Sequence, residues 1–211
     1  MDRDELWRVV DDQRRALTDQ LEELSDAEWR EPSLCTEWTV RDVAAHLTQQ
    51  HMTLGAALVG VVRARGNVAR ANRLAIDAKA AEPTAALIAE IRGHIGSRRH
   101  VPVMTDNEAL IDVVVHSQDI MTPLGRRHDV PAHAAAAAAA RIWSRPWLFR
   151  AMKGLRGLEF AATDTAFRAG SGPVVEGPAI DILLLMTGRR AGLRGLTGAG
   201  ADALRARIPA E

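Results

Sequence analysis

The sequence is short of cysteine and carries no net charge, and both features narrow the possible functions. Cys35 is the only cysteine among 211 residues, so no disulfide can form within the chain. Lysine and arginine together number 27, as do aspartate and glutamate. A chain with this balance has no overall basic field that would attract nucleic-acid phosphates. We therefore expect no nucleic acid among its partners.

Long apolar runs are also missing. The longest run, AIDILLLM at residues 179–186, is interrupted by Asp181 and is far shorter than the ~20 residues that a membrane-spanning helix needs. The first ten residues, MDRDELWRVV, lack the charged-then-apolar pattern of a secretory signal. We expect a cytoplasmic protein that has no membrane partner.

The first part of the chain has the pattern of a helical bundle. Apolar side chains recur three and four residues apart, as in amphipathic helices, in four segments. These segments are 2–24, 39–65, 83–98 and 105–122, with a polar connection over 67–81. The alanine-rich stretch 134–140 predicts a further helix from its high intrinsic propensity.

The composition changes after Arg156. Short β-type segments alternate there with glycine turns, and a helix follows that begins at Pro178 and ends at Gly188. Two unequal domains suit the length, since domains commonly hold about 100 to 150 residues. We predict a helical bundle over residues 1–154 and a small α+β domain over 155–211.

Two histidines lie in the predicted helix that begins after Thr39. The apolar face of this helix is formed by four residues: Val40, Val43, Ala44 and Leu47. His51 falls near the centre of that face and His46 at its edge, so periodicity alone favours His51 as the buried imidazole. A buried imidazole needs a hydrogen-bond partner or a metal ion, and the pattern leaves both explanations open.

A polar line runs along the predicted helix 105–122. Its members are Glu108, Asp112, His116 and Asp119. Asp112 and His116 are one turn apart and could bind one metal ion, whereas Glu108 is two turns from His116 and could not share it. Asp119 is better placed to hold the other ring nitrogen of His116 or to orient a water. Asp-x-x-x-His is a weak pattern, so an ordinary helix with an exposed aspartate and histidine is the simpler alternative.

Three stretches resemble the mycothiol-dependent maleylpyruvate isomerase family, whose members are DinB-like metal-binding helical bundles. LCTEWTVRDVAAHL and DVVVHSQDIMTPLG are similar to two motifs of the bundle. FAATD, followed by GSGPVVEGPAIDILLLMTGRR, is similar to the C-terminal domain that many members carry. The resemblance spans nearly the whole chain and implies a mainly α fold, a DinB-like four-helix bundle with a small C-terminal α+β domain.

The resemblance also implies a set of site residues. It assigns His46, Asp112 and His116 as ligands of one divalent metal ion, usually zinc. Better-studied members have glutamate at the position of Asp112, and the shorter aspartate would reach a metal only if the helices lie closer or a water intervenes. Asp119 and Arg189 are the catalytic candidates. Arg189 could bind a carboxylate of the thiol or the substrate, or it could simply cap the preceding helix.

The implied activity is a metal-dependent transfer or isomerisation of a small electrophilic substrate, with mycothiol as the thiol cosubstrate. Mycothiol and the small-molecule substrate are then the expected partners. Two alternatives stay open. One is a non-catalytic DinB-like protein that binds a metal or another ligand. The other is a redox sensor acting through Cys35, although a lone cysteine is more often a small buried apolar residue.

Overall fold

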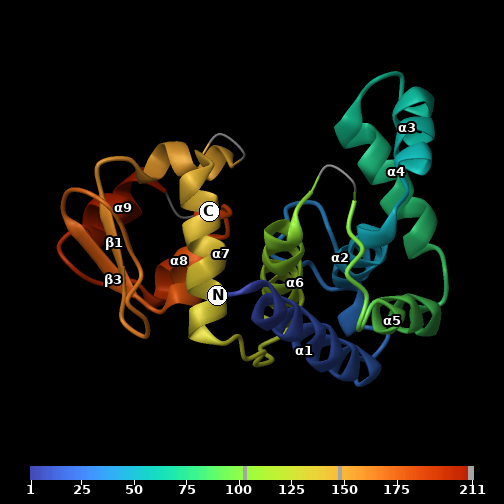
Figure 1. The fold of residues 1–211 in the computed structure, drawn as a ribbon, viewed down its shortest axis with the longest axis horizontal. Helices are drawn as coiled ribbons and strands as arrows, with labels where there is room; N and C mark the ends of the chain where they lie inside the picture. The colour runs from blue at the N-terminus through green and yellow to red at the C-terminus, as the bar shows by residue number, and fades with distance from the viewer. Residues whose placement is uncertain (102–103, 147–148, 209–211) are drawn as a thin grey trace. The chain divides into compact units, whose positions relative to one another are not determined.

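The computed structural model describes residues 1–101, 104–146 and 149–208 (Figure 1). The described chain is mainly helical and has a small three-stranded sheet near its C-terminus, which confirms the predicted fold class. It divides into an N-terminal unit, Asp2–His128, and a C-terminal unit that begins at Asp129. No helix in the described residues is both long and apolar enough to cross a membrane.

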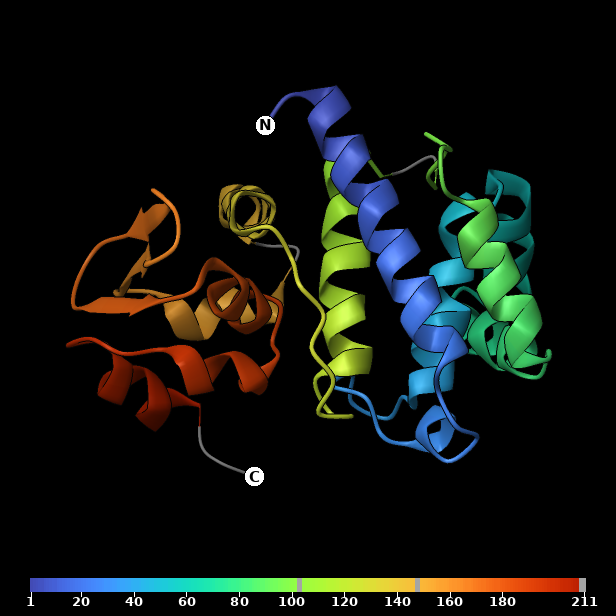
Figure 2. The ribbon, with the colours of Figure 1, turned by 90° about the horizontal axis from the view of Figure 1, so that it is seen from below.

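Four helices form the centre of the N-terminal unit. They are α1 (Arg3–Glu22), α2 (Val40–Leu47), α5 (Thr84–Gly93) and α6 (Asp106–Met121). Helix α1 packs along α6 and α5, and α2 packs against the same two helices (Figures 1 and 2). Their apolar faces enclose a core that includes Leu17, Leu21, Val43, Leu47, Ile88, Ile91, Ile120 and Met121. A short 3-10 helix, η1 (Glu28–Arg30), lies between α1 and α2.

The prediction of one helix over 39–65 is wrong. The chain instead forms α2, a 3-10 turn η2 (Thr48–His51), and a separate helix α3 (Leu54–Arg63). The break occurs at Met52, whose backbone leaves the helical region, and Thr53 then caps α3 by accepting a hydrogen bond from the Ala56 amide at 3.2 Å. His51 therefore lies outside α2 and does not belong to the apolar face on which helical periodicity places it.

The predicted polar connection over 67–81 is also wrong, because it holds helix α4 (Val68–Ala80). Asn67 caps this helix through a bond from the Arg70 amide at 3.0 Å. Ile76 is its one fully buried apolar residue and packs in a small core with Ala45 and Leu87. Helix α4 packs against both α2 and α3, so α3 and α4 form a helical hairpin beside the bundle.

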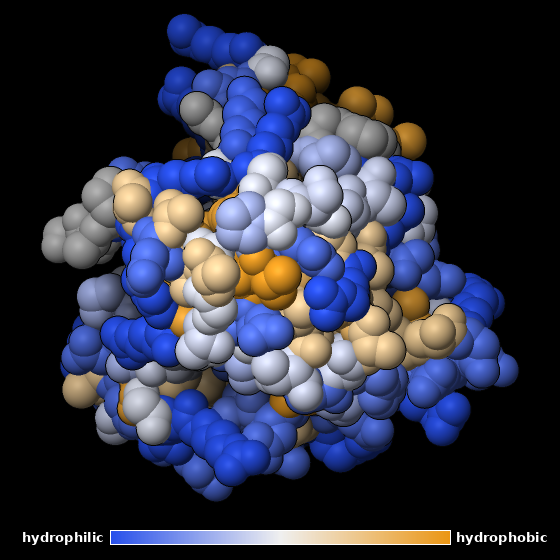
Figure 3. Space-filling model, turned by 90° about the vertical axis from the view of Figure 1, so that its left-hand side faces the viewer, coloured by the Kyte–Doolittle hydropathy of each residue, from blue (hydrophilic) through white to orange (hydrophobic). Residues whose placement is uncertain are grey.

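The C-terminal unit combines helices with the sheet. Strand β1 (Glu159–Ala162) lies in the middle, antiparallel to β2 (Arg168–Gly170) and parallel to β3 (Val174–Gly177). Other elements described in this unit are α7 (Ala132–Ser144), η4 (Arg150–Leu155), α8 (Ala179–Met186), η5 (Arg190–Gly195) and α9 (Ala201–Arg207). The strands and α8 appear where the sequence predicts them. On the face of this unit seen in Figure 3, hydrophilic side chains lie mainly towards the edges, and neutral to apolar side chains gather near the middle.

The division into units differs from the predicted boundary near Gly154. Helix α7 packs along α8, which places it in the C-terminal unit. The contact is made possible by small buried side chains on α7: Ala134, Ala135, Ala138 and Ala139. The alanine-rich stretch therefore forms a helix, as its propensity predicts, but belongs to the core of the second unit.

Candidate metal centre

The start of α2 is determined by a capping box. The Thr39 amide donates to a carboxylate oxygen of Asp42 at 2.9 Å, and the Asp42 amide donates to the Thr39 hydroxyl at 3.2 Å. Because these bonds define the first turn, His46 falls in the last turn of α2, on the side of α6. The ring of Trp38, just before the cap, lies 5.3 Å from the ring of His46 and 6.4 Å from that of His116, measured between centroids.

A second capping box starts α6. The Thr105 amide donates to the carboxylate of Glu108 at 2.8 Å, so this glutamate serves the helix terminus. One turn later comes Asp112 and, after another turn, His116. The polar line predicted along this helix is therefore divided, with Glu108 at the cap and the remaining three residues near α2.

The structure brings His46, Asp112 and His116 together. Nε2 of His46 lies 3.4 Å from Oδ1 of Asp112, and Nε2 of His116 lies 3.2 Å from the same oxygen. The two imidazole rings meet edge to face, with centroids 4.9 Å apart. One donor atom from each of the three side chains lies within 4.8 Å of the others.

These separations fit a divalent ion such as zinc. Bonds of about 2.0–2.2 Å in a tetrahedral site place neighbouring donor atoms about 3.3–3.6 Å apart. Both nitrogen–oxygen separations are close to that range. The aspartate side chain is thus long enough to reach the point where both imidazoles converge. Metal binding by the three residues stays a prediction that this geometry supports.

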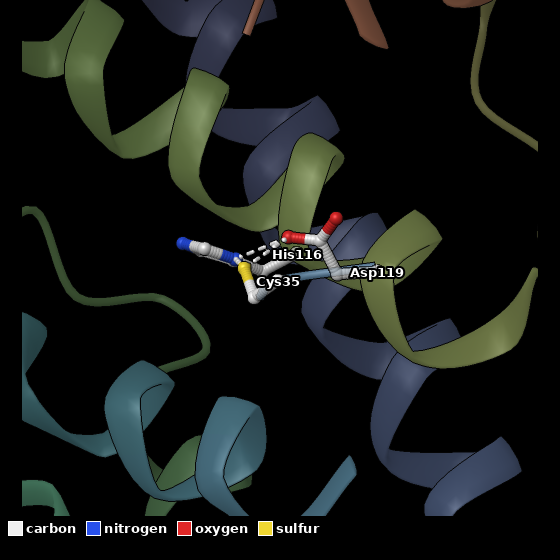
Figure 4. A group of neighbouring side chains, drawn as sticks. All are labelled: Cys35, His116 and Asp119. Atoms are coloured by element: carbon white, nitrogen blue, oxygen red, sulfur yellow. Dashed lines mark hydrogen bonds and ion pairs between the residues drawn. The ribbon is translucent and has the colours of Figure 1, made fainter. Parts of the chain in front are cut away.

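Asp119 contacts the other side of the His116 ring. Its Oδ2 lies 2.7 Å from Nδ1 of His116 (Figure 4), and its carboxylate is fully buried. A proton held on Nδ1 leaves the lone pair of Nε2 directed towards His46 and Asp112, as in the carboxylate–histidine pairs of metal sites. Its burial and this contact fit the predicted role of Asp119 in orienting His116, and its catalytic role stays a prediction.

Cys35 lies beside this pair, in the loop before α2. Its Sγ is 3.1 Å from Oδ2 of Asp119 and 3.9 Å from Nδ1 of His116 (Figure 4). The thiol donates to a buried carboxylate and so helps to satisfy it. A redox role for Cys35 stays a prediction.

Opposite charges dominate the electrostatics of the site. Burial alone would raise the pKa of Asp112, but the charge of His116 and the hydrogen bonds from both histidines outweigh burial and hold that pKa well below its usual range. Burial would likewise lower the pKa of His116, yet Asp112, Asp119 and Cys35 together raise it well above its usual value. Both shifts favour the charged forms of the pair, and a metal ion bound at Nε2 of His116 would compete with a proton for that nitrogen.

The other two predicted residues lie elsewhere. Arg189 is in the C-terminal unit, where its Nη1 donates to the Thr187 carbonyl at 2.7 Å, and its catalytic role stays a prediction. His51 does not join the three donors. Its ring instead packs against that of His94, tilted by 34°, with centroids 3.7 Å apart.

Two polar residues near the site have no counterpart in the sequence-based predictions. Nε2 of Gln50 donates to Oδ2 of Asp112 at 2.6 Å, and Nη2 of Arg14 donates to Oε1 of Gln50 at 2.6 Å. One signal could have revealed Arg14. It lies in the apolar stripe of α1, four residues after Val10 and three before Leu17, where a charged residue is unexpected.

Solved structures with a similar fold include two crystal structures of a mycothiol-dependent maleylpyruvate isomerase. One, of a mutant form, has a TM-score of 0.63 at 17% sequence identity, and the other has a TM-score of 0.62 at 18%. Each alignment covers 95% of this chain and 94% of the solved one, so the likeness includes both the helical part and the part with the sheet. No curated protein matches the sequence.

The sequence itself matches a family model. The model describes the mycothiol maleylpyruvate isomerase N-terminal domain and matches residues 10–138, which include all three predicted metal ligands. The match covers more than half of the chain, and the resemblance seen in the sequence is confirmed. This protein belongs to the mycothiol maleylpyruvate isomerase family.

Proposed function

We propose that this protein is a metal-dependent enzyme that uses mycothiol to isomerise a small electrophilic substrate or to transfer a group to it. The observation that carries the proposal is the convergence of Nε2 of His46 and Nε2 of His116 on one oxygen of Asp112. Family membership supports mycothiol as the thiol, and the solved structures of similar fold are named for a mycothiol-dependent isomerase.

The chain's own residues have distinct tasks in this proposal. His46, Asp112 and His116 would hold the ion, and Asp119 keeps His116 turned towards it. A divalent ion held by three protein ligands lowers the pKa of a bound thiol or water and so supplies a nucleophile near neutral pH. Arg189 is the candidate for binding a carboxylate of the thiol or substrate through its planar fork.

Cobalt-substituted protein provides a direct test of thiol use. Titration with mycothiol should change the visible absorption bands of the cobalt, because a sulfur ligand alters the electronic environment of the ion. Mycothiol with a methylated sulfur is the matched control and should change the bands much less. An unchanged spectrum at saturating mycothiol would contradict the proposed cosubstrate. It would instead favour a non-catalytic family member that binds a metal without using the thiol.

A further inference from the structure

We propose that Gln50, held by Arg14, is a positioning residue that orients Asp112 for metal binding. The inference rests on the proposed function, since it concerns a residue that is a metal ligand only under that proposal. It adds two side chains from two other elements, η2 and α1, to the candidate metal centre.

The two oxygens of Asp112 have different partners. Oδ1 faces Nε2 of both His46 and His116, at 3.4 and 3.2 Å. Oδ2 accepts the hydrogen bond from Nε2 of Gln50 at 2.6 Å. The terminal torsion of an aspartate has a broad energy minimum, so the side chain alone does not choose which oxygen faces which partner. The bond from Gln50 makes that choice and leaves Oδ1 for the histidines.

The orientation of the Gln50 amide is itself determined by Arg14. Nη2 of Arg14 donates to Oε1 of Gln50 at 2.6 Å, and a guanidinium has only donors. A flipped amide would place its NH₂ group against the guanidinium and its oxygen against the Asp112 carboxylate, and both contacts would be repulsive. Donor and acceptor chemistry therefore permits a single arrangement, in which the NH₂ group points at Asp112.

Arg14 is held firmly enough for this task. Its side chain is almost fully buried, with 1% of the residue surface exposed. Nη1 donates to the His94 carbonyl at 2.8 Å, and the guanidinium lies 5.8 Å from the centroid of the Trp7 ring. A carboxylate oxygen of Asp11 lies 3.7 Å from Nη1 of Arg14. These contacts offset part of the cost of burying the charge and leave Nη2 directed at Gln50.

The test compares zinc affinity in matched variants, measured by competition with a chelator. Gln50→Leu should weaken zinc binding about 10–100-fold, the usual effect of removing a group that orients a metal ligand. Gln49→Leu is the control. It makes the same chemical change one residue earlier, and in the described part of the chain Gln49 forms no hydrogen bond with Asp112. Its affinity should stay within about twofold of wild type, well below the effect expected for Gln50.

The role of Arg14 is tested by combining changes. Arg14→Lys keeps the charge but loses the planar fork, so it should weaken zinc binding by less than Gln50→Leu does. Because Arg14 acts through Gln50, the double variant should bind no more weakly than Gln50→Leu alone. Additive losses would overturn the relay. If Arg14→Lys does not fold, the Gln50 and Gln49 variants still decide the role of Gln50.

A further pair of variants separates this inference from the proposed function. Asp112→Ala should abolish tight zinc binding, and Gln50→Leu should have no added effect in that background. Wild-type affinity in Asp112→Ala would contradict the ligand set itself. If Asp112→Ala loses zinc but Gln50→Leu binds zinc as wild type does, only the positioning role is overturned. A lower melting temperature of metal-free Gln50→Leu with unchanged affinity would also overturn it, because that result describes a purely structural contact.

Discussion

Nδ1 of His116 lies 2.7 Å from Oδ2 of Asp119, and the aspartate is fully buried. This bond keeps Nε2 of the same ring facing His46 and Asp112. The pair connects a part of the protein that is closed to solvent with the three predicted metal ligands.

Asp119→Asn should weaken zinc binding about 10–100-fold, because a neutral amide holds the Nδ1 proton of His116 less strongly than a carboxylate does. Competition with a chelator measures the affinity. Ser117→Ala, on the same helix, is the control, since its hydroxyl bonds to the Val113 carbonyl and not to a predicted ligand. Equal affinity in wild type and Asp119→Asn would show that the aspartate does not orient the ring.

Thr39→Ala should lower the free energy of unfolding by about 0.5–2 kcal/mol, because it removes the side-chain bond that caps α2. Thr39→Ser keeps an oxygen at the same place and should recover most of the loss. Urea unfolding measures both variants. A serine variant as unstable as the alanine variant would mean that the cap bond is not the source of the effect.

Stability should fall in acid because of His94. Burial, together with charge repulsion from His51, Arg14 and Arg99, lowers the pKa of His94 from 6.5 to about 3. Below pH 6.5 the unfolded chain therefore takes up a proton that the folded protein resists, so the stabilising contribution present above pH 6.5 is lost as the pH falls towards 3.

His94→Phe removes this titration and keeps an aromatic ring against His51. Between pH 6.5 and 3 its stability should decline less steeply than that of wild type, by up to about 1.4 kcal/mol per pH unit for one proton. Urea unfolding at a series of pH values gives the two slopes. Parallel curves would contradict the account.

Local sequence patterns predict most elements of the fold. The helices that follow Thr39 and Thr105 begin where the sequence predicts, because each start depends on a capping box of residues only three positions apart. The break after α2 was not predictable in this way. TQQHM, residues 48–52, contains no glycine or proline, so the sequence predicts that the helix continues through it. In the protein Gln50 contacts Asp112 and His51 contacts His94, and both contacts join distant parts of the chain.

The same limit applies to the site. The spacing of Asp112 and His116 within one helix is a local pattern, so the sequence alone indicates that the two side chains could bind the same metal ion. Helical periodicity favours His51 over His46 as the buried imidazole only if one unbroken helix contains both residues. Gln50 is separated from Asp112 by 62 residues and from Arg14 by 36, so neither contact leaves a local pattern. Only the packing of α1, η2 and α6 brings these three side chains into contact.

The metal content of four purified proteins tests the central claim most directly. After reconstitution with zinc and removal of free ion, wild type and His51→Ala should each hold close to one zinc ion per chain. His46→Ala and His116→Ala should hold almost none, because each loses one of the three converging donors. Wild type without bound zinc would contradict the account, and so would a His51→Ala protein that loses zinc while His46→Ala keeps it.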